Sequence, residues 1–362
     1  MARPSTRDPP LTSPGVKVDA LVNAQPLRRM QEIARDAEAA GFAGLTITEA
    51  GRTAYLSAAA AALVTELDLA TGVAVAFPRS PMVTASNAWE LADVSGGRFR
   101  LGLGTQVRAH IERRYSAEFD PPGPRLREYV LALRAIFRAF AGDERLAFDG
   151  DHWSMDLLPR EWSPGPIDAG APPIDLAAVN PWMLRMAAEV ADGVHVHPLN
   201  TPTYLEQTLL PNLAAGAAAA GRPADEVTVH VPCFTVVGDT EDERAARREA
   251  ARFQIAFYGS TPNYAYLFEQ LDREGTTPRL QAALKAKDLG AVPSIIDDDL
   301  LRHFVVECPW DGLADALVDR YEGTASRVVL YFAGRTWDED RTAFARLGEA
   351  ARDVHRRTGP TS

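Results

Sequence analysis

Short apolar segments alternate with helical segments along this chain of 362 residues. Strand-like stretches fall at residues 17–23, 45–49, 70–77, 99–105, 173–180, 193–199, 227–238 and 326–334. Helix signals follow them, as in PLRRMQEIARDAEAAGF, which has proline at its first turn and glycine near its end. Regular alternation of this kind predicts parallel strands, and eight units match a closed barrel. We therefore expect an α/β fold, a (β/α)8 TIM barrel with insertions.

The eight units leave no need for a second domain. Residues 1–16 are rich in proline, serine and threonine and lack the apolar core of a secretory signal, which predicts a disordered leader. Residues 17–362 are expected to form a single barrel domain. Two insertions interrupt it: a hairpin at RLAFDGDHWSM and a helical stretch at about residues 258–300.

Charge and composition exclude several classes of partner. The chain has 38 Lys and Arg against 49 Asp and Glu, a net charge of −11, which argues against nucleic acid and anionic membranes. No apolar run reaches the ~18 residues of a membrane-spanning helix. Cys233 and Cys308 do not form a CxxC pair, so we expect no zinc or redox pair and a cytoplasmic location. The expected partner is a small-molecule substrate.

A glycine-rich stretch, GRFRLGLGTQVRAHIERRY at residues 97–115, raises the question of a nucleotide loop. A dinucleotide fingerprint needs a third glycine, where this chain has Val107, and it belongs to the first βαβ unit rather than the fourth. In a barrel, a strand that ends in Gly-Leu-Gly-Thr opens onto the catalytic face, and its glycines let a flat ligand approach the backbone. The alternative is simple packing at a barrel corner.

Five motifs occur in one order along the chain: EIARDAEAAGF, TGVAVAFPRSP, SGGRFRLGLGTQ, AAVNPWMLRMAAEVADGVHVHP and LLRHFVVECPWDGLADAL. On these motifs the chain resembles the luciferase-like (bacterial luciferase) superfamily of flavin and deazaflavin oxidoreductases, and among its branches the enzymes that use coenzyme F420. The resemblance implies a homodimeric enzyme that transfers a hydride between F420 and an organic substrate. The alternative within the family is an FMN-dependent monooxygenase that uses reduced flavin and O2. A catalytically silent flavin-binding barrel and a metal hydrolase remain as further alternatives.

Three side chains are the predicted catalytic residues. Glu49 ends a strand on the face it shares with Leu45 and Ile47, so it is expected at the barrel mouth, where the family's acidic residue touches cofactor or substrate; an ion-paired or capping glutamate is the alternative. His110 matches a family position that contacts the cofactor, or is an exposed loop residue. His197 lies nearer the mouth than His195 on the same strand face.

The resemblance also marks departures from the family pattern. Ala50 stands where the family often has a catalytic histidine, and Val107 where the sugar-phosphate dehydrogenase branch has a glutamate. An H-x-H pair such as His195 and His197 binds metal in some barrels, but no motif places further ligands, so no metal site is predicted. The histidines that form no constellation are expected to be structural or superficial: His152, His230, His303 and His355.

The predicted cofactor-binding residues follow from the same resemblance. The family has a cis peptide behind the flavin ring, which corresponds here to Gly72 and Val73. The remaining predicted contacts are Gly102, Gly104, Thr105, Gln106, Arg108, Ala177, Ala178, Val179 and Asn180. The last four form a turn before a helix whose N-terminus favours anions, or a plain connecting turn.

Charged and aromatic side chains complete the candidate site. Arg108, with Arg113 and Arg114, could meet the phosphodiester and polyglutamate tail of the deazaflavin, or form a solvated helix face with Glu112. Five aromatic residues are candidates for a substrate cavity or for packing: Trp153, Trp182, Tyr258, Tyr264 and Tyr266.

Overall fold

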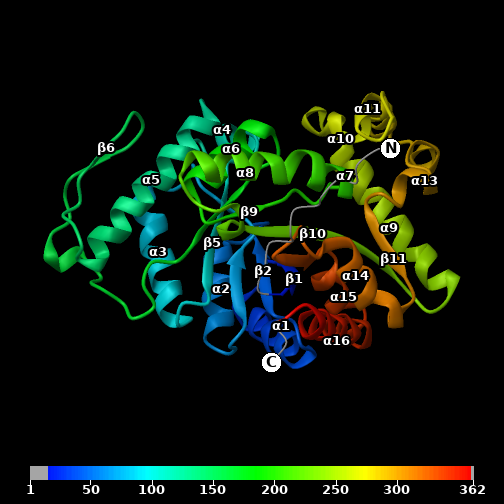
Figure 1. Ribbon diagram of the computed structural model, residues 1–362, viewed down its shortest axis with the longest axis horizontal. Coiled ribbons are helices and arrows are strands. Elements are labelled where there is room, and N and C mark those ends of the chain that lie inside the picture. Colours follow the sequence, from blue (N-terminus) through cyan, green and yellow to red (C-terminus); the bar gives the residue numbers. More distant parts are fainter. Residues whose placement is uncertain (1–14, 360–362) are drawn as a thin grey trace, which may run out of the picture.

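Parallel strands close into a barrel in the computed structural model, which describes residues 15–359 (Figure 1). The strands of the main sheet are β1 (Lys17–Asn23), β2 (Gly44–Thr48), β3 (Asp68–Thr71), β4 (Ala74–Val75), β5 (Phe99–Gly104), β8 (Ile174–Ala177), β9 (Gly193–His195), β10 (Thr228–Val237), β11 (Val305–Cys308) and β12 (Arg327–Leu330). Around the barrel the order is β1-β2-β3-β5-β8-β9-β10-β12, and β12 pairs with β1 to close it. β4 continues the path of β3 and pairs with β5. The predicted TIM barrel is thereby confirmed.

Helices follow the strands and cover the outside of the barrel. The longer ones are α1 (Leu27–Ala40), α2 (Ala54–Ala62), α3 (Pro81–Val94), α4 (Arg108–Arg114), α5 (Pro122–Ala141), α6 (Pro181–Val190), α8 (Leu210–Ala219), α9 (Glu241–Gly259), α11 (Thr276–Ala286), α14 (Leu313–Tyr321), α15 (Ala333–Glu339) and α16 (Arg341–Thr358). Short ones are α7 (Pro202–Tyr204), α10 (Ala265–Glu269), α12 (Val292–Ile295) and α13 (Asp298–Leu301). No helix in the described part of the chain is long and apolar enough to cross a membrane.

Local sequence explains where several helices begin and end. α1 buries Met30, Ile33, Ala34 and Ala37, a helical spacing, and stops at Gly41 in the left-handed conformation. α9 begins with a capping box, in which Thr240 and Glu243 satisfy each other's backbone N–H groups.

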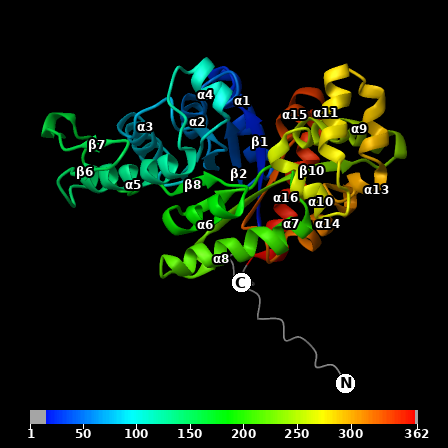
Figure 2. The same cartoon turned by 90° about the horizontal axis from the view of Figure 1, so that it is seen from above.

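Both insertions lie away from the barrel axis, at opposite ends of the molecule (Figures 1 and 2). The hairpin pairs β6 (Phe148–Asp149) with β7 (Ser154–Met155) in antiparallel fashion. At the other end, α10 to α13 pack near α9. The predicted leader falls mostly on residues 1–14, which lie outside the described residues.

Two strand predictions need correction. The last predicted strand extends to residue 334, but β12 ends at Leu330 and α15 begins at Ala333. β11 was not predicted as a strand. It pairs with the outer half of β10, because β10 is 10 residues long and projects beyond the part that pairs within the barrel.

Branched aliphatic side chains usually fill the interior of a TIM barrel. In this barrel the interior is polar instead. The guanidinium of Arg327 donates to both carboxylate oxygens of Asp19 at 2.6 Å and to Asp68 at 2.8 Å. Arg100 donates to both oxygens of Asp175 at 2.6 and 2.8 Å. The alternate apolar residues of the same strands therefore face the helices, and the main hydrophobic core lies between strands and helices.

Candidate active site at the barrel mouth

The strand-three bulge is the first element of the candidate site. The peptide bond between Gly72 and Val73 is cis, as predicted. Both residues are partly exposed, whereas Thr71 before them and Ala74 after them are fully buried. The Gly72–Val73 peptide is thus exposed at the mouth, whereas the residues on either side of it are buried.

Glu49 supports this bulge from the helical side. Its carboxylate accepts hydrogen bonds from Arg79 at 2.5 and 2.9 Å and from the backbone N–H of Val75 at 2.7 Å. Thr46, three residues earlier on β2, points into the barrel, because a Cβ at Gly72 would lie 2.2 Å from the Thr46 methyl carbon. Side chains alternate between the two faces of a strand, so Glu49 points away from the interior. The structure therefore shows the ion-paired glutamate, one of the two predicted alternatives. Its part in proton transfer stays a prediction.

The glycines at the end of β5 are required by packing. A Cβ at Gly102 would lie 1.9 Å from the carbonyl oxygen of Thr71 and 2.6 Å from Nε2 of His195, and one at Gly104 would lie 2.7 Å from the Val73 side chain. Packing therefore requires glycine at both positions, and their contact with a cofactor stays a prediction. Their small size also allows the bulge and β5 to lie together at the mouth.

The loop after β5 carries the predicted polar contacts. Thr105 is partly exposed, and Gln106 has a positive φ of 58° with an exposed side chain. His110 is exposed on α4, and its side chain makes no hydrogen bond to another of the described residues. Arg108 is held by carboxylates of this chain: it donates to Asp120 at 2.6 Å and to Glu112 at 2.9 Å.

The turn after β8 is fixed by hydrogen bonds from both sides. The side chain of Asn180 caps α6 by accepting from the N–H of Met183 at 3.0 Å. The carbonyl oxygen of Val179 accepts from the phenols of Tyr204 at 2.8 Å and Tyr266 at 3.4 Å. Ala178 is buried and Ala177 is partly exposed, so Ala177 is the one of the two alanines that reaches the mouth surface.

His197 follows β9 and is held in one tautomer. Its Nδ1 accepts a hydrogen bond from the N–H of Leu199 at 3.1 Å, so the proton of the neutral ring is on Nε2. Burial lowers the pKa of His197 to about 3, which keeps the ring neutral at physiological pH. The side-chain amide of Asn200 donates to the carbonyl oxygens of His197 and Pro232, and this fixes the turn against β10.

Tyr258, near the end of α9, and Tyr264, shortly after α9, both contact the His197 ring. Its ring stacks on Tyr264 with 4.1 Å between centroids and meets the edge of Tyr258 at 4.8 Å. The phenol of Tyr258 lies 2.6 Å from that of Tyr331, which follows β12. Of the five predicted aromatic residues these two are at His197, whereas Trp153 packs against Tyr129 at 5.2 Å. Trp182 is largely exposed on α6, where it packs over Gly123.

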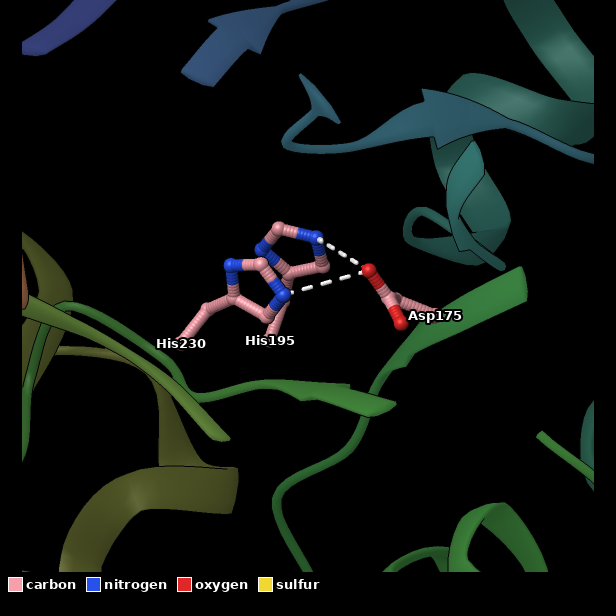
Figure 3. Close-up of side chains that lie close together, drawn as sticks. All are labelled: Asp175, His195 and His230. Atoms are coloured by element: carbon pink, nitrogen blue, oxygen red, sulfur yellow. Dashed lines mark ion pairs between the residues drawn. The ribbon is translucent and has the colours of Figure 1, made fainter. Parts of the chain in front are cut away.

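A buried cluster of three side chains below the mouth includes His230. The sequence analysis had placed His230 among the histidines that form no constellation. His195, His230 and Asp175 project from β9, β10 and β8 toward one another (Figure 3). The imidazoles stack with 4.3 Å between centroids, and Nε2 of His230 lies 3.1 Å from the Asp175 carboxylate. Burial and the neighbouring cations and imidazole lower the pKa of His195 well below its ordinary value. The sequence could not show this constellation because its members lie on three different strands.

The ligand atoms of the three residues lie within 4.8 Å of one another, a spacing that could hold a metal ion. The two imidazole rings stack with an interplanar angle of 21°. Both oxygens of Asp175 already accept from Arg100. The absence of a metal site stays a prediction.

Small residues and open backbone lie on one side of the mouth and aromatic rings on the other. The candidate site is thus at the carboxyl ends of the strands, where TIM-barrel enzymes have their active sites. The chain belongs to the luciferase-like monooxygenase family, which its residues 7–327 match. This family of oxidoreductases confirms the resemblance found in the sequence motifs.

Relatives and solved structures agree with this assignment. The chain is 38% identical over 318 residues to an uncharacterized protein of Mycobacterium tuberculosis, covering 88% of this chain and 93% of the relative. It is 29% identical over 298 residues to 5,10-methylenetetrahydromethanopterin reductase of Methanolobus tindarius, covering 79% and 84%. Coenzyme F420-dependent tetrahydromethanopterin reductase of Methanopyrus kandleri has a TM-score of 0.74 at 20% identity, covering 93% and 98%.

Sequence reasoning missed several residues of the site. Arg79, which holds Glu49, and Asn200, which holds His197, have no motif signal because their partners are distant in sequence or are backbone atoms. Tyr331 had a usable signal: it lies in the second half of the predicted strand at residues 326–334, toward the end where side chains reach the mouth.

Proposed function

We propose that this enzyme transfers a hydride between coenzyme F420 and an organic substrate. The observation that carries the proposal is the pairing of the open Gly72–Val73 peptide with an aromatic wall across the same barrel mouth. The named activity of the Methanopyrus reductase, and the 29% identity to the Methanolobus reductase, support it.

The residues at the mouth fit a flat ring system. Gly72, Val73 and Ala177 are small and partly exposed, so a ring can lie close to the backbone on this side. Arg108 and the exposed His110 lie on α4, after β5. The coenzyme's phosphate and acidic tail would meet Arg108 there in competition with its carboxylate partners Glu112 and Asp120. When bound, the deazaflavin would supply the hydride chemistry, and the protein would supply position and a dry environment.

The chain's own residues would hold and orient the substrate. Nε2–H of His197 is a fixed neutral donor, because Leu199 occupies its other nitrogen. The rings of Tyr258 and Tyr264 cover this imidazole and exclude water from it. Glu49 and Arg79 hold Val75, and with it the bulge, in place.

A fluorescence titration of the purified protein with F420 and, separately, with FMN tests the proposal. Tighter binding of F420 by at least about tenfold, or ~1.4 kcal/mol, supports the deazaflavin. Preference for FMN would favour the FMN-dependent monooxygenase instead. Binding of neither cofactor would overturn both.

Two matched variants locate the site. Ala177→Leu adds bulk beside Gly104, since a Cβ at Gly104 would lie 3.4 Å from the Ala177 methyl group. We expect it to weaken cofactor binding by more than about tenfold without unfolding the protein. Ala345→Leu makes the same change at a partly exposed position on α16 and should leave binding unchanged. If both variants weakened cofactor binding equally, the cofactor would not bind at the mouth.

A further inference from the structure

A cavity of about 140 Å³ lies between β10 and the helices that cover it. Side chains alternate between the two faces of a strand, and His230 of β10 points into the barrel. Thr235 and Val237 lie an odd number of positions further along β10, so they face the helices, and both line the cavity. The cavity is therefore outside the barrel wall, and a molecule bound in it would not occupy the mouth.

Cationic, hydroxyl and aromatic side chains line this cavity together. Arg247 and Ala250 come from α9, Trp310 from the turn before α14, and Arg335, Thr336 and Glu339 from α15. Three separate segments of the chain thus bring polar groups to one space.

Arg247 lines the cavity as a cation that no carboxylate neutralises. Within the described part of the chain, this half-buried side chain donates to the carbonyl oxygen of Val237 and lies over the ring of Trp310, but it forms no ion pair. The guanidinium carbon of Arg247 is 5.2 Å from the Trp310 ring centroid, and that of Arg346 is 4.7 Å from it. Because a charge that is partly removed from water is stabilised by an opposite charge, this place favours an anion.

Arg335 supplies a second cation to the same cavity. It donates to Glu339 at 2.7 Å, and both side chains of this pair are 59% exposed. An exposed ion pair contributes at most about 1 kcal/mol, so an anion in the cavity can compete with Glu339 for Arg335. The neighbouring Thr336 also lines the cavity and offers a hydroxyl donor.

These groups and the size of the cavity suit a small oxyanion. Guanidinium groups donate to several oxygens of one phosphate or carboxylate group. The volume is several times the roughly 30 Å³ that a water molecule occupies in the liquid, so a group of about five non-hydrogen atoms fits.

The position in the barrel agrees with this chemistry. Phosphate sites of TIM barrels frequently lie beside the loops after the seventh and eighth strands. In this chain those strands are β10 and β12, and Phe332 and α15, which follow β12, line the cavity. The coenzyme's phosphate would instead meet Arg108 after β5, the fourth barrel strand.

We propose that this cavity is a binding site for a small oxyanion, a phosphate or a carboxylate group, held by Arg247, Arg335 and Thr336. The occupant is a second ligand and not the group that reacts at the mouth. The inference does not rest on the proposed function, because none of these three residues belongs to the candidate site at the mouth.

The test measures anion binding to the full chain without coenzyme. Inorganic phosphate is followed by the broadening of its phosphorus NMR line, and carbon-13-labelled acetate by the broadening of its carboxylate line. We expect saturable binding of at least one of the two anions, and the anion that binds more tightly identifies the group that the site prefers.

Matched variants separate this cavity from the rest of the surface. Arg247→Gln should weaken binding of the anion by about tenfold or more, because a charge-assisted hydrogen bond is lost. Arg28→Gln removes an exposed charge on α1 and should leave binding within about twofold. Ala250→Leu fills the cavity and should weaken binding as Arg247→Gln does, whereas Ala345→Leu on α16 should not. If Arg247→Gln does not fold, the two alanine variants carry the comparison.

Each further outcome bears on one proposal. Absence of saturable binding of both anions, equal weakening in Arg247→Gln and Arg28→Gln, or full binding in Ala250→Leu overturns the oxyanion site. Saturation with F420 should leave anion binding unchanged, and displacement of the anion by F420 would overturn a site separate from the coenzyme. Failure of F420 to bind, with anion binding intact, overturns the proposed function alone.

Discussion

Glu49 binds the guanidinium of Arg79 through both carboxylate oxygens, at 2.5 and 2.9 Å, and it also accepts the N–H of Val75. Arg79 lies over the ring of Tyr55 at 5.1 Å and donates to the Val75 carbonyl oxygen at 2.9 Å. Glu49, which directly follows β2, therefore holds β4, the short strand after the bulge, in place. These hydrogen bonds hold the backbone at Val75 in place, and the part of Glu49 in proton transfer stays a prediction.

Replacing this anchor should cost stability and cofactor affinity together. Glu49→Gln leaves a largely buried guanidinium without its carboxylate, and we expect a loss of about 3 kcal/mol in the free energy of unfolding, measured by urea denaturation. Glu66→Gln removes an exposed ion pair with Arg98 and should cost less than about 1 kcal/mol. Unchanged stability of Glu49→Gln, with reduced turnover, would instead indicate a role in proton transfer.

The neutral state of His197 predicts a pH dependence of stability. Burial lowers its pKa to about 3, whereas histidine in an unfolded chain titrates near 6.5. Between these values the unfolded state binds a proton that the folded state does not bind, so stability is lost as pH falls below 6.5. From pH 7.5 to pH 5 this loss should be about 2 kcal/mol.

The measurement compares urea denaturation of the wild type with that of His197→Gln at both pH values. The variant has no titrating group at this position, so its stability should fall by about 2 kcal/mol less. His195, whose pKa is also lowered, contributes equally to both proteins and cancels. Identical pH dependence in the two proteins would show that His197 is not held neutral.

The close approach of β3, β5 and β9 predicts intolerance of a single methyl group. Gly102→Ala places a Cβ 1.9 Å from a backbone oxygen and 2.6 Å from the His195 ring, so the strands must separate. We expect a loss of about 3 kcal/mol, seen as a lower midpoint of thermal unfolding. Gly290→Ala, at an exposed position with 3.4 Å of space, should be nearly neutral. A fully stable Gly102→Ala protein would contradict this strand packing.

The buried Asp175 cluster is expected to depend on Arg100 and not on a metal. Incubation with EDTA should change the thermal midpoint by less than about 1 °C, whereas removing a structural metal would destabilise the fold. Asp175→Asn leaves Arg100 unpaired and should cost about 3 kcal/mol. Asp168→Asn, at an exposed carboxylate, is the control. A large effect of EDTA would identify the cluster as a metal site.

The residue types along each strand predicted the barrel but not which strand face lines it. Barrel strands are buried on both faces, so alternation such as that of Leu45, Thr46 and Ile47 shows two sets of side chains without telling inside from outside. Pairing between strands decides this. Arg100 and Asp175 lie 75 positions apart in the chain, and only the closed sheet places them together in the interior.

The sequence by itself determined the barrel, the family, the bulge at Gly72 and the position of His197 beside the mouth. These depend on local periodicity and on motifs, which are contained in short segments of chain. The tertiary structure alone decided that Glu49 is paired with Arg79, that His230 joins His195 and Asp175, and that Tyr258 meets Tyr331. Each of these contacts joins residues tens of positions apart, and its energy exists only after the barrel has closed around it.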